Sequence, residues 1–304
     1  MVETEALTPA ATDSLLAQIN AELAAGTFDS SDSQLLQRLV AALADHRGMV
    51  RFGFVEAFGK IGSPIVPFLL ESLANHPNPV VRRSCGKSLA KIGDPQAVPI
   101  LIQALLYDSD TVARSSAAGA LAKMGPEAVR ALLDVLAGDY PETAKGHASW
   151  AIAFIGPSAR DSLYGAIDSD SADVRTAVVG AIANLVQAEA DDCAARTLRD
   201  RALKFLLAAL TDSSEQVRAE AATALGNLGH RLAVTQLINL LADDSSEVRK
   251  VTALALGKIG DVAAIAPLQE KISTSTQSES QVFAVAITQI DRKNSDFSGT
   301  VDDY

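Results

Sequence analysis

The side chains with the greatest capacity for binding chemistry lie on one short stretch near the middle of the chain. In KGHASWAIAFIG, residues 145–156, His147, Trp150 and Phe154 stand at positions i, i+3 and i+7, so a helix would place them on one stripe. Trp150 is the single tryptophan of the protein. Exposed aromatic side chains often dominate binding energy, so the stripe predicts an apolar floor for a protein helix or a flat ligand. The alternative is that these rings pack against neighbouring helices.

Further candidate binding residues lie in neighbouring segments. One is aromatic: Phe52, which follows a basic residue early in the chain. The basic candidates come from neighbouring segments of the same type: Arg83, Lys87, Lys91 and Lys123. On a protein of formal net charge −11, a basic strip would pair with carboxylates of a ligand or with an acidic protein surface. The alternative is that they are ordinary solvated lysines on helices.

The elements that position these residues form a repeat. A basic residue is followed eleven positions later by a glycine, or once by a valine, in seven segments: Arg51/Gly62, Arg82/Gly93, Arg114/Gly125, Lys145/Gly156, Arg175/Val186, Arg218/Gly229 and Arg249/Gly260. Successive basic positions differ by 31, 32, 31, 30, 43 and 31 residues. An eighth, degenerate copy places Gln281 at the basic position. A period this regular predicts stacked supersecondary units.

Each unit is predicted to hold two helices, as in Val81 to Asp108. Apolar residues at helical spacing mark the second helix, and Gly93 is expected to end it as a left-handed cap. Prolines mark the start of the first helix, where the missing amide hydrogen costs nothing. An acidic loop precedes the second helix, and we interpret the repeated arginines as braces that bind these loops rather than as functional residues.

The repeats set the expected domain boundaries. Residues 1–32 are predicted to be an N-terminal segment with a capping helix, beginning at Thr12 and Asp13 and ended by Gly26. Residues 33–291 are predicted to form one continuous array, not two globular domains, with an insertion near 187–202 that either extends the flanking helices or protrudes as a loop. Residues 292–304 lose the period and are expected to be a disordered acidic tail.

Composition excludes several functions. The acidic charge, with a pI of about 4.8, disfavours nucleic-acid binding. No stretch has the length of a membrane span and the N-terminus lacks a secretory pattern, so we expect a cytoplasmic protein. Cys85 aligns with small residues and is expected to be a buried, inert thiol, whereas Cys193 lies in the insertion. No phosphate loop, nucleophile motif or metal-ligand spacing is present, so we assign no catalytic residue and no metal ligand.

The repeat itself resembles a known family. VRRSCGKSLAKIGDPQAVPILIQALLYD and VRKVTALALGKIGDVAAIAPLQ are similar to the short HEAT-like repeat of cyanobacterial phycobilin lyases, and the resemblance covers about residues 33–291. This family includes paired E and F type bilin lyases and a lyase-like phycobilisome degradation protein. The resemblance implies an all-α fold, a right-handed α-solenoid (superhelix) of about eight short HEAT-like two-helix repeats with an N-terminal helical cap.

The resemblance implies three functions. We favour a non-catalytic, protein-binding scaffold of the phycobilisome system that holds a phycobiliprotein, with or without its bilin, in a concave groove formed by the second helices. The first alternative is a bilin lyase subunit that attaches or detaches phycocyanobilin through a C–S bond at a phycobiliprotein cysteine, working with a partner subunit. The second is a scaffold for an A-type iron–sulfur carrier. No cofactor is expected beyond phycocyanobilin as a ligand.

Overall fold

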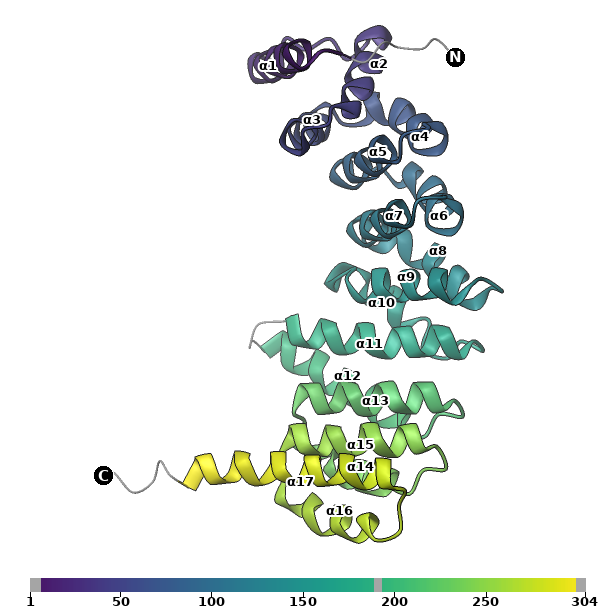
Figure 1. Ribbon diagram of the computed structural model, residues 1–304, viewed down its shortest axis with the longest axis vertical. Helices are drawn as coiled ribbons and strands as arrows, with labels where there is room; N and C mark the ends of the chain where they lie inside the picture. The colour runs from purple at the N-terminus through teal and green to yellow at the C-terminus, as the bar shows by residue number, and fades with distance from the viewer. Residues whose placement is uncertain (1–6, 189–192, 299–304) are drawn as a thin grey trace, which may run out of the picture. The chain divides into compact units, whose positions relative to one another are not determined.

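The computed structural model describes residues 7–188 and 193–298, and all regular structure in these residues is helical (Figure 1). By its internal contacts the chain divides into two compact units, unit 1 (Met1–Ser162) and unit 2 (Leu163–Tyr304). The sequence predicts one continuous array, so this division differs from the expectation. The boundary falls within the shortest of the α-helices, and each unit is a solenoid of paired helices.

Eight helix pairs follow a single N-terminal helix in the described residues. The single helix is α1 (Pro9–Ala25), which packs against α3. The first helices of the pairs are α2 (Ser33–Ala41), α4 (Val66–Asn75), α6 (Val98–Tyr107), α8 (Pro126–Ala137), α10 (Arg160–Tyr164), α12 (Cys193–Ala209), α14 (Val234–Leu240) and α16 (Ile265–Ile272). The second helices are α3 (Gly48–Ile61), α5 (Pro79–Ile92), α7 (Thr111–Met124), α9 (Glu142–Ala153), α11 (Ala172–Ala188), α13 (Glu215–Leu228), α15 (Ser246–Ile259) and α17 (Gln277–Ser298). The predicted all-α solenoid of about eight two-helix repeats is therefore confirmed.

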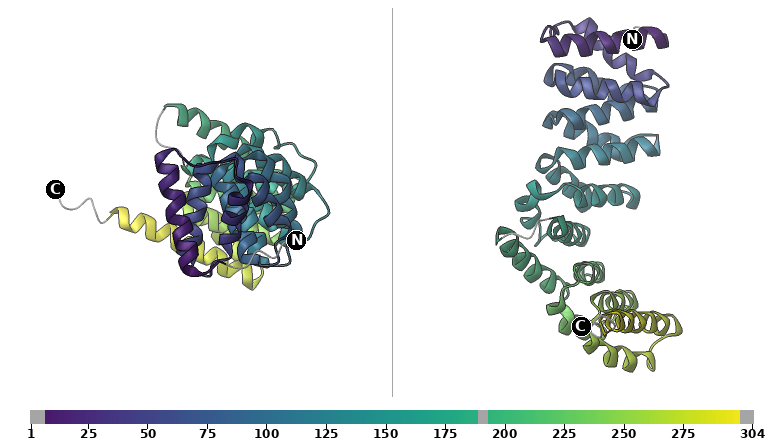
Figure 2. Two further views of the ribbon diagram at one scale, coloured as in Figure 1. Left: turned by 90° about the horizontal axis from the view of Figure 1, so that it is seen from above. Right: turned by 90° about the vertical axis from the view of Figure 1, so that its left-hand side faces the viewer.

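Within each unit the second helices form one row and the first helices another. In unit 1, α3, α5 and α7 are neighbours in order, and in unit 2 the same holds for α11, α13, α15 and α17. The right-hand view of Figure 2 shows the successive helix pairs of unit 1 stacked one on the next. The exposed surface of the row formed by α3, α5, α7 and α9 is called the second-helix face of unit 1 below.

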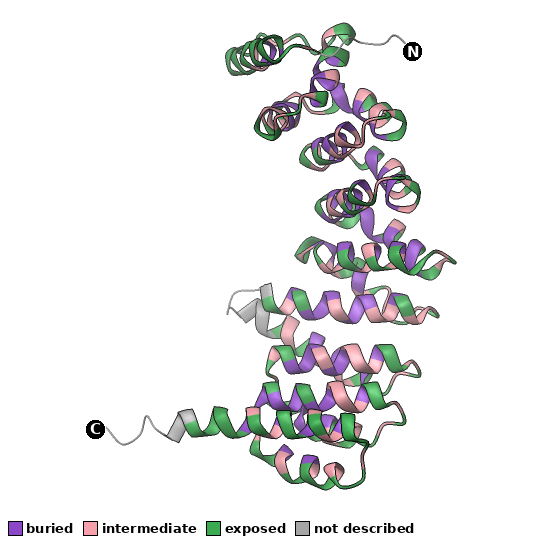
Figure 3. Ribbon diagram, viewed as in Figure 1, coloured by how far each residue is buried: buried purple, intermediate pink, exposed green. Residues whose placement is uncertain are grey.

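Small residues let the second helices approach closely. Buried positions of the second helices include Ala117 and Ala148 in unit 1 and Ala221 in unit 2, which align with Cys85. At Gly226 on α13, an added Cβ atom would lie 2.6 Å from the Cα atom of Ala255 on α15. Figure 3 shows buried positions on the helix faces that point at neighbouring helices and exposed positions on the outer faces. The alanine-rich sequence is thus a packing requirement of this fold.

The helix ends follow local sequence signals. Gly93 ends α5 in the left-handed region, with φ 76° and ψ 21°, and its amide donates to the carbonyl of Leu89. Asp110 caps α7 by accepting a 2.7 Å hydrogen bond from the amide of Ala113. The start of α1 differs from the prediction, because Thr8 caps the helix and Thr12 is buried inside it.

The insertion and the C-terminal segment also have helical structure. The 43-residue spacing is taken up by two helices of 17 residues, α11 and α12, which are longer than most of their counterparts. Residues 292–298 continue α17, which corrects the expected disordered tail at these positions, while 299–304 lie outside the described residues. The helix continues there because Asn294 donates to the carbonyl of Gly260 at 3.0 Å, which ties it to the preceding repeat.

None of the helices in the described residues alone has both the length and the apolar composition for crossing a membrane. One pair, Gly48–Ile61 with Ser63–Asn75, meets the criterion only when both are taken together across a 116° bend.

Candidate functional site

The repeated arginines bind the loops, as the sequence interpretation predicts. The guanidinium group of Arg82 donates to both carboxylate oxygens of Asp108, at 2.8 and 2.6 Å, and to the carbonyl oxygen of His76 in its own repeat at 2.8 Å. The same two-sided bonding recurs in unit 2, where Arg175 binds Asp212, Arg218 binds Asp243 and Arg249 binds Glu279. We therefore exclude these arginines from the candidate site.

The braces also fix the ionisation of their acceptors. Hydrogen bonds from Arg175 and from Arg218 lower the pKa of Asp212 and of Asp243, respectively, and burial opposes this effect only in part. Arg114 makes only the bond to its own loop, 2.9 Å to the carbonyl oxygen of Asp108. In the next loop the position that corresponds to Asp108, six residues before the basic residue, is Asp139, and this aspartate is exposed.

Trp150 and Phe154 form an exposed aromatic pair in unit 1. Their ring centroids are 4.8 Å apart and the rings are tilted by 36°, at a separation typical of interacting aromatic pairs. Trp150 is 48% exposed and Phe154 is 63% exposed. The pair presents a continuous apolar surface, so the rings do not fill an interior gap.

Local structure explains how the two rings meet. The helix α9 ends at Ala153, two residues before Ile155, and the amides of Phe154 and Ile155 make short-range bonds to Ala151 and Ile152. Phe154 is therefore the C-cap residue, which corrects the expectation that it lies inside the helix. The inner edge of the Trp150 ring lies over Gly119 of α7, where an added Cβ atom would be 4.0 Å from the ring.

His147 does not extend this aromatic surface. Its Nε2 atom lies 3.2 Å from the hydroxyl oxygen of Ser115 on α7, and its Nδ1 atom is buried without a hydrogen-bond partner. The side chain is half-buried. The structure thus places His147 between α7 and α9, and Trp150 with Phe154 on the surface.

The basic candidates divide into paired and unpaired side chains. Arg83 lies 3.2 Å from the carboxylate of Asp110, and Lys91 lies 3.0 Å from the carboxylate of Glu56, with its alkyl chain over Gly59. The remaining two candidates, Lys87 and Lys123, are exposed, and the structure gives neither of them an ion pair. Phe52 is 56% exposed on α3. The assignment of these residues to a concave groove stays a prediction.

The two cysteines differ in what the structure says of them. Cys85 is fully buried, and its burial raises the pKa of the thiol well above its ordinary value, as expected for an inert core residue. Cys193 begins α12, but its side chain lies outside the described residues. Across the described part of the chain, no group of three or more His, Cys, Asp or Glu side chains is placed to hold a metal ion.

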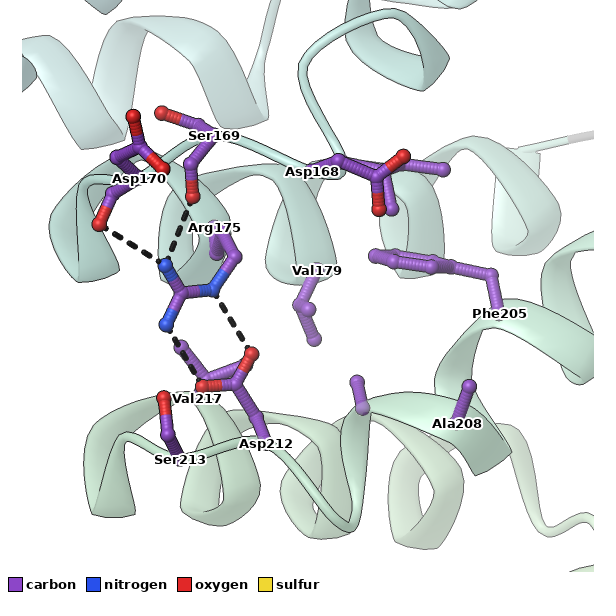
Figure 4. Close-up of a pocket in the computed structure, with 12 residues that line it drawn as sticks. Asp168, Ser169, Asp170, Arg175, Val179, Phe205, Ala208, Asp212, Ser213 and Val217 are labelled. Atoms are coloured by element: carbon purple, nitrogen blue, oxygen red, sulfur yellow. Dashed lines mark hydrogen bonds and ion pairs between the residues drawn. The ribbon is translucent and has the colours of Figure 1, made fainter.

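A cavity in unit 2 was not predicted from the sequence. It has a volume of about 530 Å³ and lies between the segment after α10, helix α11, helix α12 and the start of α13 (Figure 4). Its apolar lining includes Ile167, Val179 and Phe205, and its polar lining includes Asp168 and the brace formed by Arg175 and Asp212. This volume is within the usual range for ligand pockets.

The cavity has a structural cause. Helix α10 contains five residues, whereas α4 and α6 contain ten each, and the chain after Tyr164 continues as turns through Asp168. A shorter first helix covers less of α12 and leaves the ring of Phe205 half-buried. Gly165 and the 43-residue spacing in the same region are the two signals in the sequence that could have indicated an irregular repeat.

Comparison with known proteins places the fold. The family described as HEAT repeats matches residues 66–153 and 203–287, which together make up more than half of the chain. The chain belongs to the HEAT-repeat family. The matched ranges include the helix pairs that carry Lys87, Lys123 and Trp150 in unit 1, so these three candidate residues lie within matched HEAT repeats.

A curated relative carries the resemblance further. The chain is 34% identical over 88 residues to the bilin biosynthesis protein MpeU of Synechococcus sp. (strain WH8020). The match covers 29% of this chain and spans 30% of the relative. The predicted likeness to phycobilin lyase-like HEAT-repeat proteins is confirmed for that stretch. An iron–sulfur carrier gains no support from these matches and is not considered further.

Two solved structures have similar helical repeats. Human deoxyhypusine hydroxylase in complex with glycerol is 19% identical, with 94% of this chain and 100% of that chain covered and a TM-score of 0.37. A chain from the complex of CpcE and CpcF of phycocyanin lyase from Nostoc sp. PCC7120 is 20% identical, with 64% of this chain and 99% of that chain covered and a TM-score of 0.31.

Proposed function

We propose that this protein is a binding subunit of the phycobilisome system that holds a phycobiliprotein on the second-helix face of unit 1. The observation that carries the proposal is the exposed pair of Trp150 and Phe154, whose tilted rings are in contact. Other repeats place lysine, asparagine, glycine or threonine at many of the corresponding positions, so the pair is an exception to the repeat. The sequence identity of 34% over 88 residues with a bilin biosynthesis protein supports the biological context of the proposal.

The electrostatics of the face suit this partner. Lys87 on α5 and Lys123 on α7 are exposed and precede the aromatic pair along the row of second helices. A partner with carboxylates beside an apolar patch would pair with the lysines and cover the two rings. Charged groups at the rim of such an interface chiefly raise the association rate, whereas the buried aromatic side chains determine the dissociation rate.

The binding test uses immobilised protein and purified phycobiliprotein subunits, each with and without its chromophore. Replacing both rings, in Trp150→Ala with Phe154→Ala, is expected to weaken binding by about tenfold or more, which corresponds to the loss of an aromatic hot spot. Leu232→Ala is the matched control, because Leu232 is an apolar residue of unit 2 that is 71% exposed. Unchanged affinity in the folded double variant would remove the basis for the proposal.

The second candidate is a bilin lyase subunit that attaches or detaches phycocyanobilin at a phycobiliprotein cysteine. The name of the relative, a bilin biosynthesis protein, favours it. The discriminating experiment incubates the protein with phycocyanobilin and a chromophore-free subunit, with and without a candidate partner subunit. Bilin fluorescence that stays with the subunit on a denaturing gel indicates covalent attachment, whereas binding without such fluorescence indicates the scaffold.

A further inference from the structure

The cavity in unit 2 is lined by two aspartates, Asp168 and Asp170, whose carboxylates make no hydrogen bond or ion pair in the described structure. The guanidinium group of Arg175 is fully engaged, because it donates to both oxygens of Asp212 and to the carbonyl oxygens of Ser169 and Asp170. Asp212 is likewise satisfied by Arg175 and by the amide of Ser214. Asp168, in contrast, is exposed and makes no hydrogen bond or ion pair in the described structure.

The lining of the cavity is negatively charged overall. It carries three aspartates, Asp168, Asp170 and Asp212, and a single cationic group, Arg175. Because Arg175 neutralises Asp212, two negative charges are uncompensated. In Figure 4, Asp168 lies on the side of Phe205, away from the Arg175 and Asp212 pair. The carboxylate of Asp168 and the ring of Phe205 therefore lie at the same end of the cavity.

The aromatic pair of Tyr164 and Phe205 beside the cavity already binds one guanidinium group, that of Arg201. Tyr164 meets Phe205 edge to face, with ring centroids 6.5 Å apart and an angle of 70°. The guanidinium carbon of Arg201 lies 3.9 Å from the centroid of the Tyr164 ring. Arg201 therefore already covers one face of the Tyr164 ring, whereas Phe205 is one of the residues that line the cavity.

We propose that this cavity is a site for an arginine side chain presented by a partner protein. The planar guanidinium group would lie against the ring of Phe205 and pair with the carboxylate of Asp168, and its alkyl chain would contact Ile167, near the fully buried Val179. Arginine suits the site better than lysine because a planar, weakly hydrated cation can stack on an aromatic ring and bond a carboxylate at the same time. This site is independent of the aromatic pair in unit 1.

The test uses methyl-labelled protein and a short blocked peptide, acetyl-Gly-Arg-Gly-amide. The comparison peptide contains citrulline in place of arginine, because citrulline has nearly the same shape and no charge. We expect saturable shifts of the Ile167 and Val179 methyl resonances with the arginine peptide, and binding that is about tenfold weaker with the citrulline peptide, equivalent to ~1.4 kcal/mol.

Two variants make the result specific. Asp168→Asn is expected to weaken binding of the arginine peptide by about tenfold, to the level of the citrulline peptide, as expected for loss of a charge pair combined with stacking. Asp244→Asn is the matched control, because Asp244 is an exposed loop aspartate of another repeat in unit 2. Equal shifts with both peptides, full binding by Asp168→Asn, or no saturable shift of either methyl group would each overturn the proposal.

Discussion

Arg82 donates from Nε and Nη2 to the two carboxylate oxygens of Asp108, which belongs to the next repeat, at 2.8 and 2.6 Å. The side chains are 11% and 3% exposed, so both charges are largely removed from water. A guanidinium and a carboxylate in this geometry are stabilising only as a pair, because either one alone would be a buried, uncompensated charge. The ion pair between Arg82 and Asp108 therefore both stabilises the fold and holds two successive repeats at a fixed spacing.

Breaking this pair should destabilise unit 1. Asp108→Asn removes the charge, and its amide group would face a guanidinium donor, so we expect a loss of ~2–4 kcal/mol in the free energy of unfolding. Urea denaturation followed by circular dichroism measures the effect. Lys91→Ala, which removes an exposed pair with Glu56, is the control and should cost less than ~1 kcal/mol. A smaller effect of Asp108→Asn than of Lys91→Ala would contradict the assigned role.

The last brace predicts a pH dependence. Hydrogen bonds from Thr276, together with those from Arg249 and Ser246, lower the pKa of Glu279 to about 2, from an ordinary value of 4.5. Between these two values the unfolded chain binds more protons than the folded chain, so stability falls as pH falls. Stability from this group should be full above about pH 5 and lost progressively toward pH 2. Glu279→Gln should flatten that part of the stability curve, and an unchanged acid slope would refute the prediction.

Two helical glycines should respond in opposite directions to alanine. Gly226→Ala would bring a Cβ atom to 2.6 Å from the backbone of Ala255, so the helices must separate, at a cost of ~1–3 kcal/mol. Gly146→Ala on α9 meets no atom within 4 Å and should stabilise by ~0.5–1 kcal/mol through a less flexible unfolded chain. Urea denaturation of both variants checks the difference, and the same sign for both would contradict the close packing of α13 and α15.

The single tryptophan reports directly on the aromatic pair. Because Trp150 is half exposed, acrylamide should quench its fluorescence in the folded protein. Phe154→Ala should increase the quenching and shift the emission to longer wavelength, because the neighbouring ring shields part of the indole. The free energy of unfolding should change by less than about 1.5 kcal/mol, the upper value for an aromatic pair. Quenching that matches the wild type would show that the two rings are not in contact in solution.

Repeated features of this chain could be predicted from the sequence, because each is specified by local residues in every copy. Gly93 ends its helix as expected, Arg82 binds the loops as expected, and Cys85 is buried as expected. Their environment recurs about every 31 residues, so one copy confirms the interpretation of another.

Features that occur once were predicted less well. The helix α9 ends early, at Ala153, where Phe154 contacts Trp150, and the extended α17 is bonded to the preceding repeat through Asn294. The cavity beside Phe205 arises because α10 is short, which shows only when neighbouring helices are placed together. His147 was assigned to the stripe by its spacing, but its contact with Ser115 on another helix determines its position.

The arginine–carboxylate pairs of unit 2 all run in the same direction along the chain. Each arginine takes its carboxylate from the repeat that follows it, from Arg175 to Asp212, Arg218 to Asp243 and Arg249 to Glu279. Shortening the chain from its C-terminal end would therefore leave a half-buried guanidinium group without its carboxylate. A cut just before Asp212 would instead leave that carboxylate without its arginine, although it would still accept the amide of Ser214. The two ends of this array are therefore chemically unequal: shortening leaves a cation at the C-terminal end and an anion at the N-terminal end, each still bonded to its own loop.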